Sequence, residues 1–142
     1  AALRSSFIVG YPGETEDDVA ELASFLEAAA LDWAGFFPYS AEEGTAAAAL
    51  PSQLDHLEVA ERLRYLHDVQ EGITVSASLN QVGRRHSVLV DQLEEGVAVG
   101  RSYRQAPEID GVITLDRGIP GEWLEVEIVA ALGSDLEGVV IR

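Results

Sequence analysis

The chain has 142 residues, of which 47% are apolar and 24% are charged, as in ordinary globular proteins rather than in disordered ones. Its 25 acidic residues face nine basic ones, all of them arginine, so the formal net charge is −16. Such a surface repels a polyanion unless the arginines cluster, and it attracts a basic partner. Because the chain has no cysteine, it cannot by itself build a disulfide, a Cys₄ zinc site or a thiolate-held iron–sulfur cluster.

The first half of the chain has the pattern of two strands joined by a helix. Residues 5–9 and 33–37 are short apolar runs typical of buried strands, and Thr15 is a natural N-cap for the helix between them. Two strands that are linked by a helix usually lie parallel in one sheet. A longer helix is predicted over residues 55–82, where Gly72 is a candidate bend.

After Gly83 the pattern changes to short strands without helices between them. Turn residues separate five such strands, which are predicted at residues 87–91, 97–103, 111–115, 123–129 and 136–141. Five short strands in about 60 residues indicate a small closed barrel of the OB type. We therefore predict two domains, residues 1–82 and residues 83–142.

Two loops at strand ends are the first candidates for a ligand site. Residues 10–14 follow the first strand and residues 38–44 follow the second, and parallel sheets bind ligands at the carboxyl ends of their strands. Gly10 and Gly13 would let the backbone approach a ligand closely. The alternative is a tight strand-to-helix turn without a ligand, in which the Glu14 carboxylate bonds the backbone of its own turn.

The sequences of these two loops resemble the late part of radical S-adenosylmethionine enzymes. The strand end IVGYPGET (residues 8–15) is similar to a motif of several subfamilies, and FPYSAEEGT (residues 37–45) narrows the resemblance to the methylthiotransferases. RSYRQAPEIDG (residues 101–111) is the most specific stretch and resembles the RimO branch. That branch modifies an aspartate of a small-subunit ribosomal protein.

This resemblance implies a fold and a chemistry. Residues 1–82 would be the carboxyl-terminal portion of a TIM-like radical-SAM barrel with a long linking helix, and residues 83–142 a five-stranded, OB-like TRAM barrel that recognises the substrate. Members of the family work in the cytoplasm and insert a methylthio group into a C–H bond. They use S-adenosylmethionine and two 4Fe–4S clusters, which are held by cysteines in an earlier part of the polypeptide. We therefore expect this chain to be the tail of a longer enzyme, inactive alone, without metal ligands, and with exposed sheet edges and one apolar face.

The resemblance also implies residues beside the cofactor. The strand-end motif and the next strand end would lie at the cofactor cavity, which gives the candidates Gly10, Tyr11, Pro12, Gly13, Glu14 and Phe37. Tyr39 follows at the same strand end as Phe37. Ile8 or Val9 would form an apolar wall for the adenine, unless both are simply core residues of a buried strand.

In the barrel half, Arg101, Tyr103 and Arg104 bring two cations and an aromatic ring to one strand end. OB-type domains use such sets to stack bases and to contact phosphates. Glu108 and Asp110 beside them repel phosphate, and the alternative is a polar strand terminus without a ligand. These five residues are the candidates for substrate binding.

Charge separates the possible partners. Residues 83–142 contain six arginines and eleven acids, a net charge of −5. Affinity for transfer RNA depends on neutralising phosphates, so this barrel suits it poorly, whereas a basic ribosomal protein is complementary to it. Two alternatives stay open: the sister branch that modifies an adenosine of transfer RNA, and a non-catalytic acidic OB-like module that binds a basic protein.

Overall fold

The computed structural model describes residues 3–104 and 111–141. The described residues form two compact units, of which the first covers Leu3–Ile73 and the second begins at Thr74. The division falls within helix α2 (His56–Leu79), upstream of the boundary that the sequence predicts near Gly83. No helix in the described part of the chain has the length and apolar character needed to cross a membrane.

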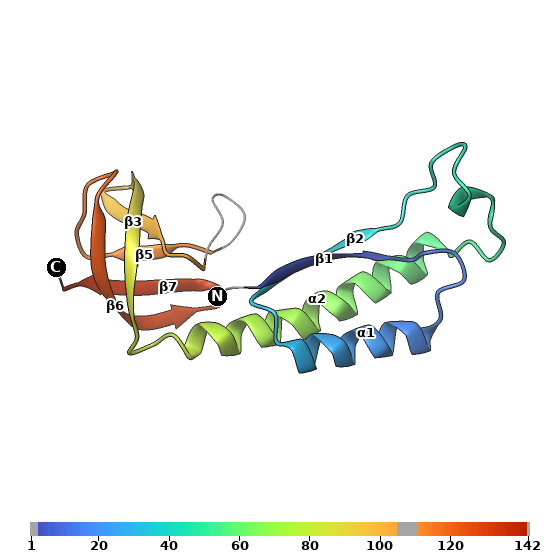
Figure 1. Cartoon of the computed structure of the whole chain (residues 1–142), viewed down its shortest axis with the longest axis horizontal. Coiled ribbons are helices and arrows are strands. Elements are labelled where there is room, and N and C mark those ends of the chain that lie inside the picture. The colour runs from blue at the N-terminus through green and yellow to red at the C-terminus, as the bar shows by residue number, and fades with distance from the viewer. Residues whose placement is uncertain (1–2, 105–110, 142) are drawn as a thin grey trace. The chain divides into compact units, whose positions relative to one another are not determined.

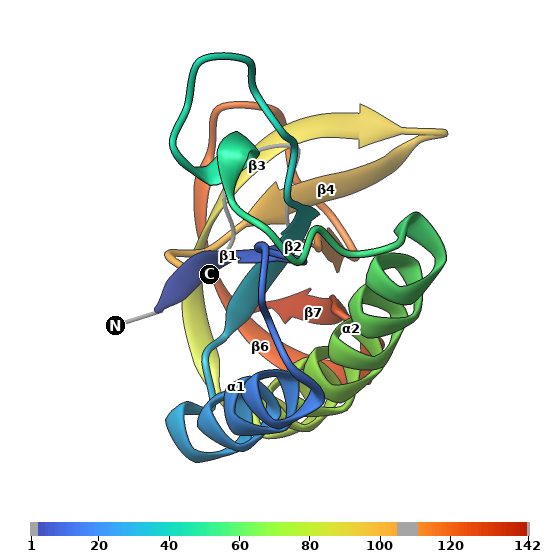
Figure 2. The same ribbon diagram turned by 90° about the vertical axis from the view of Figure 1, so that its right-hand side faces the viewer.

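The first unit contains a two-stranded sheet backed by two helices. Strands β1 (Arg4–Val9) and β2 (Trp33–Pro38) pair in parallel, as the sequence predicts, with Phe7 opposite Phe36 and Ile8 opposite Phe37. Helices α1 (Glu16–Ala29) and α2 lie on the same side of this sheet (Figure 1 and Figure 2). The unit is therefore one layer of strands on one layer of helices.

Helix α1 begins after Thr15, the N-cap that the sequence predicts. The Thr15 hydroxyl accepts a hydrogen bond from the Asp18 amide at 3.2 Å, and the Asp18 carboxylate accepts one from the Thr15 amide at 2.9 Å. This reciprocal pair satisfies two amides that have no partner within the helix. The negative charges of Glu16 and Asp17 in the same turn are favoured by the helix dipole. The acids after the glycine loop therefore start a helix, whose N-cap is Thr15 as predicted.

The core of the first unit lies between the sheet and the helices. Its buried members come from both layers and are Val9, Val19, Ala23, Leu26, Leu31, Phe36 and Leu66. The opposite face of the sheet is open: Ile8 is 66% exposed and Phe37 is 55% exposed. Each strand has only one neighbour in the described part of the chain. The expected open edges and apolar face are thus confirmed.

The connection from β2 to α2 contains one short element, the 3₁₀ helix η1 (Ala47–Ala49). Helix α2 then continues through Gly72 without interruption, so the candidate bend does not end or divide it. Glycine costs about 1 kcal/mol relative to alanine within a helix, but helices in proteins are held mostly by tertiary packing, to which the fully buried Leu66 contributes here.

The second unit contains a closed barrel of five strands, as the sequence predicts. The strands are β3 (Arg85–Glu94), β4 (Val97–Arg101), β5 (Ile113–Leu115), β6 (Trp123–Leu132) and β7 (Asp135–Val140). They close in the order β3-β4-β5-β7-β6, with β5 and β7 parallel and every other pair antiparallel. β3 and β6 are longer than predicted because each contains a register shift, and such bulges bend a strand around a barrel without ending it.

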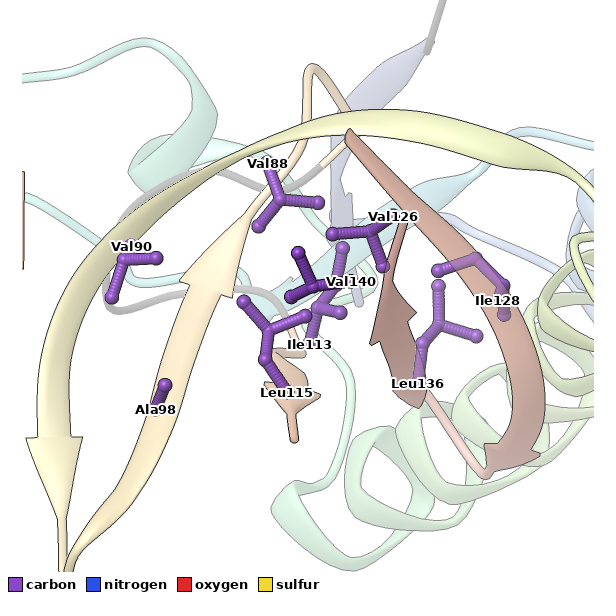
Figure 3. Packing of buried hydrophobic residues seen from close by; sticks show 9 residues of the cluster. All are labelled: Val88, Val90, Ala98, Ile113, Leu115, Val126, Ile128, Leu136 and Val140. Carbon is purple, nitrogen blue, oxygen red and sulfur yellow. The ribbon is translucent and has the colours of Figure 1, made fainter. Parts of the chain in front are cut away.

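The barrel interior is filled by aliphatic side chains (Figure 3). They come from all five strands and are Val88, Val90, Ala98, Ile113, Leu115, Val126, Ile128, Leu136 and Val140. On β6, Val126 and Ile128 are buried while Trp123 and Glu125 are exposed, which is the alternation of a half-buried strand. Gly138 on β7 faces Val126 so closely that a Cβ there would overlap the valine side chain. The interior is therefore a packed core and not a channel.

Candidate functional site

The Gly10–Glu14 turn connects the carboxyl end of β1 to α1. Gly10 and Gly13 have φ angles of +93° and +88°, a region that other residues rarely adopt. The Glu14 amide donates to the Tyr11 carbonyl at 2.9 Å, and the Gly13 amide donates to the Ser52 carbonyl at 3.0 Å. At Gly10 a Cβ would also lie 2.7 Å from a Val59 methyl of α2. Both conformation and packing therefore require glycine at position 10.

A buried arginine of α2 holds this turn. Arg62 is 8% exposed, and its Nη1 donates to the Glu14 carboxylate at 2.8 Å and to the Glu14 carbonyl at 3.1 Å. Its Nη2 donates to Glu58 at 2.7 Å, one turn earlier on the same helix. The second Glu14 carboxylate oxygen accepts from the Gly10 amide at 3.0 Å. The Glu14 carboxylate thus accepts a hydrogen bond from the backbone of its own turn, which is the alternative to a ligand-binding role that the sequence left open.

The charge state of Arg62 is fixed by these contacts. Burial lowers the pKa of its guanidinium, but the hydrogen bond to Glu14 and the charges of Glu58 and Glu14 raise it by more, so the pKa lies above its ordinary value. Both carboxylate oxygens of Glu14 are engaged, so this side chain is a structural clamp. Sequence reasoning missed Arg62, although its spacing of four residues from Glu58 was a local signal.

A cavity of about 310 Å³ lies at the carboxyl ends of β1 and β2. Its walls come from the strand ends, the loop before α2 and the first turns of α2, and they include Gly10, Pro38, Tyr39, His56, Val59 and Leu63. The Tyr39 hydroxyl is buried and has no hydrogen-bond partner among the described residues. An unpartnered hydroxyl beside a cavity is unusual, because buried polar groups are normally satisfied.

The predicted cofactor-side residues do not all face this cavity. Gly10 lines it, and the Tyr11 ring packs edge-on against Tyr39 with the ring centroids 5.6 Å apart. Pro12 is buried and Gly13 is exposed in the same turn. Phe37 lies beside Ile8 on the open face of the sheet, because side chains alternate along β2. Val9 points the other way, into the core.

The predicted substrate-binding residues of the barrel differ in their exposure. Arg101 forms an ion pair with Asp91, Nε to Oδ1, at 3.5 Å. Tyr103 is 68% exposed, whereas Arg104 is only 3% exposed. The strand β4 ends at Arg101, two residues before the predicted end. Glu108 and Asp110 lie outside the described residues.

His86 is a buried histidine at one end of the barrel. Its Nε2 lies 2.8 Å from the Gln81 Oε1, and its ring centroid lies 5.7 Å from that of Tyr103. Burial lowers the pKa of His86, and the positive charges of Arg104 and Arg84 lower it further. The neutral imidazole is therefore the favoured form. None of the described residues forms a group of three or more His, Cys, Asp or Glu side chains suited to a metal ion.

Comparison with known proteins agrees with this architecture. The family model of the TRAM domain matches residues 82–141. A ribosomal protein uS12 methylthiotransferase RimO from Nitrosomonas europaea is 46% identical over 130 residues, or 89% of this chain. Proteins of the same name from Cutibacterium acnes and Streptomyces griseus are 43% and 45% identical over 96% of the chain. The chain spans 29% of the length of each of these three relatives. It belongs to the RimO family of methylthiotransferases, and it carries the TRAM domain of that family.

Proposed function

We propose that this chain is the carboxyl-terminal part of a radical S-adenosylmethionine methylthiotransferase that acts on ribosomal protein uS12. The observation that carries the proposal is the extent of the similarity. Relatives named for this activity are 43–46% identical to the chain over 89–98% of it, so the match includes the first unit as well as the TRAM domain. A ribosomal-protein substrate also implies a cytoplasmic enzyme.

In this proposal, residues 1–82 complete a radical-SAM barrel and residues 83–142 form the substrate-recognition domain. The parallel β1–β2 pair supplies strands of the barrel, and its helices supply part of the outer layer. The exposed Ile8 and Phe37 support this role, because barrel strands need such side chains on the inner face. Further strands would pair with the open edges and cover the apolar face.

S-adenosylmethionine and two 4Fe–4S clusters would supply the radical and sulfur chemistry when bound. The fit of this chain to them is partial. The strand-end turn from Gly10 to Gly13 offers close backbone approach, and Tyr11 and Phe37 offer apolar surface for an adenosyl group. Glu14 fits less well as a direct ligand, because Arg62 and the Gly10 amide occupy both of its carboxylate oxygens. With no cysteine in the chain, cluster ligands would come from the rest of the enzyme.

The acidic character of the second half supports a basic protein as substrate. Its net charge of −5 steers a cationic partner toward it and opposes the approach of a phosphate backbone. Arg101, the more exposed of the two candidate arginines, is already paired with Asp91. Transfer RNA is therefore the second candidate substrate.

The test is a parallel reaction with both substrates. The complete polypeptide that contains this chain is reconstituted with iron and sulfide, and then incubated with S-adenosylmethionine and either uS12 or transfer RNA. We expect uS12 alone to gain the mass of one methylthio group on an aspartate. A variant with its cluster-binding cysteines replaced by alanine is the control. A gain on transfer RNA, with none on uS12, would overturn the proposal.

A further inference from the structure

A tryptophan stands exposed on the outer wall of the barrel, at the first residue of β6. Leu89 on β3 pairs with Arg101 of β4 on one side and with Trp123 of β6 on the other, so these three side chains form one cross-strand row. Figure 3 shows Val88 and Val126 pointing into the barrel, so their neighbours Leu89 and Glu125 point outward. We call this outer surface the Trp123 face, and define it as Leu89, Asp91, Arg101, Trp123, Glu125 and Glu127.

The apolar part of this face is large for a surface position. Trp123 is 68% exposed, and its row neighbour Leu89 is half-buried. Tryptophan is among the residues most often found at the energetic centre of protein interfaces, because one rigid ring covers a large contact area. An indole that is exposed at the start of a strand contributes little to the packed core of the barrel itself.

The polar part of the face is acidic. Glu125 and Glu127 follow Trp123 on the same side of β6, and successive side chains on one side of a strand are neighbours. The Ser87 hydroxyl donates a short hydrogen bond to Glu125, which fixes that carboxylate on the surface. The one cation of the Trp123 row, Arg101, has its charge offset by Asp91. Arg85 of β3 lies opposite Glu127, whereas Ser87 and not a cation lies opposite Glu125. The face therefore presents an indole beside the Glu125 carboxylate, which has no arginine opposite it.

This combination selects one kind of partner. An indole attracts the cations of arginine and lysine through the negative face of its ring, and arginine stacks on it as well. A carboxylate within reach adds a charge-assisted hydrogen bond to the same group. Phosphate would be repelled by the same carboxylates, so the surface around Trp123 favours a basic protein over a nucleic acid.

We propose that the Trp123 face is the surface on which the barrel binds a basic protein segment, with an arginine or lysine of the partner stacked on Trp123 and paired with Glu125. This rests on the proposed function for the identity of the partner, uS12. The location of the surface rests on the strand register, exposure and charge of the barrel alone.

The test uses this chain and purified uS12 as the probe. Binding is titrated by calorimetry, and in parallel by tryptophan fluorescence. Trp123→Ala removes the indole, and the double variant Glu125→Gln, Glu127→Gln removes two charges. The matched controls are Leu132→Ala, at a 70% exposed position near the end of β6, and Glu137→Gln on β7. Thermal unfolding of every variant checks that the barrel stays folded.

We expect Trp123→Ala to weaken uS12 binding about tenfold or more, as at interface centres, and Trp123→Phe to recover part of that loss. The double variant is expected to weaken binding and to flatten its dependence on salt. Both control variants should bind uS12 with an affinity within about twofold of that of the unchanged chain.

Three results would overturn the proposal: binding that Trp123→Ala leaves within about twofold, equal losses in the control variants, or no binding of uS12 by the unchanged chain. A short RNA duplex that binds the Trp123 face in place of uS12 would do the same. These results differ from failure of the proposed function. The complete enzyme can still transfer a methylthio group to uS12 when its Trp123→Ala variant binds normally, and then only the assignment of the surface is wrong.

Discussion

Arg62 and Glu14 are 48 residues apart in sequence and joined twice in space, since one guanidinium nitrogen of Arg62 donates to both the carboxylate and the carbonyl of Glu14. The same carboxylate holds the Gly10 amide through its other oxygen. The turn at the end of β1 is thus fixed from α2 and does not depend on its own residues alone. This relationship gives a direct test of what shapes the turn.

Replacing Arg62 with methionine should destabilise the first unit by about 3 kcal/mol, because it leaves the largely buried Glu14 carboxylate without its cation. The amide of Gly10 should also exchange with solvent faster. Hydrogen exchange measured by mass spectrometry gives both quantities. Arg64→Met, at an exposed position on the same helix, is the matched control and should change little. Adding Glu14→Gln to Arg62→Met should restore part of the loss, and equal losses in the Arg62 and Arg64 variants would show that the clamp contributes nothing.

The two glycines of the turn separate conformational strain from packing. Both have φ near +90°, but only Gly10 faces a close neighbour, the side chain of Val59. Gly13→Ala should therefore cost about 1 kcal/mol from backbone strain alone, and Gly10→Ala about 1–3 kcal/mol more. Urea unfolding of the two variants measures the difference. Val59→Ala in the Gly10→Ala background should reduce this difference in unfolding free energy. Equal costs for Gly10→Ala and Gly13→Ala would show that the Val59 side chain moves aside without a measurable loss of stability.

Many elements of this fold are determined by residues that are close together in the sequence, and those elements could be predicted. The Thr15–Asp18 capping box needs only its own spacing, and the alternation of Val126 and Ile128 with exposed residues needs only the period of a strand. Five strands with turn residues between them indicated a closed barrel for the same reason. The parallel β1–β2 pair could be predicted because two strands joined by a helix usually form a right-handed βαβ unit.

The features that were missed depend on contacts between distant residues. The burial of Arg104 and the pairing of Arg62 with Glu14 follow from how the chain closes on itself, and no local pattern encodes either. The bulges that lengthen β3 and β6 depend on barrel curvature. Phe37 was predicted beside the cofactor cavity, and its exposed position on the open sheet face leaves that role as a proposal.

The open face of the β1–β2 sheet should make this chain associate. Ile8 and Phe37 are paired in register and both are more than half exposed, so two copies of the chain can bury these side chains against one another. Ile8→Thr with Phe37→Thr should lower self-association, measured by sedimentation at increasing concentration, with little loss of stability. Leu57→Gln, at a position 76% exposed on α2, is the control. Unchanged self-association in the double variant would show that the chain does not associate through this face of the sheet.

Stability of the barrel should fall in mild acid because of His86. The folded barrel lowers the pKa of this imidazole through burial, and through Arg104 and Arg84, whereas in the unfolded chain it keeps its ordinary value of 6.5. Below that value the unfolded chain binds more protons than the folded one, so the free energy of unfolding decreases as the pH falls from 6.5 toward the lowered pKa. Above 6.5 this contribution no longer changes with pH.

His86→Gln removes the titrating group, so its barrel should lose less stability than the unchanged chain when the pH falls from about 7.5 to about 5.5. Carboxylates titrate in the same interval in both proteins, so the comparison isolates the histidine. Protection of the slowest amides of β3 and β6 at the two pH values measures the loss for the barrel alone. The same loss in both proteins would mean that burial of His86 does not couple its protonation to folding. A smaller loss in the variant would show that the packing of His86 between Gln81 and Tyr103 holds a neutral ring.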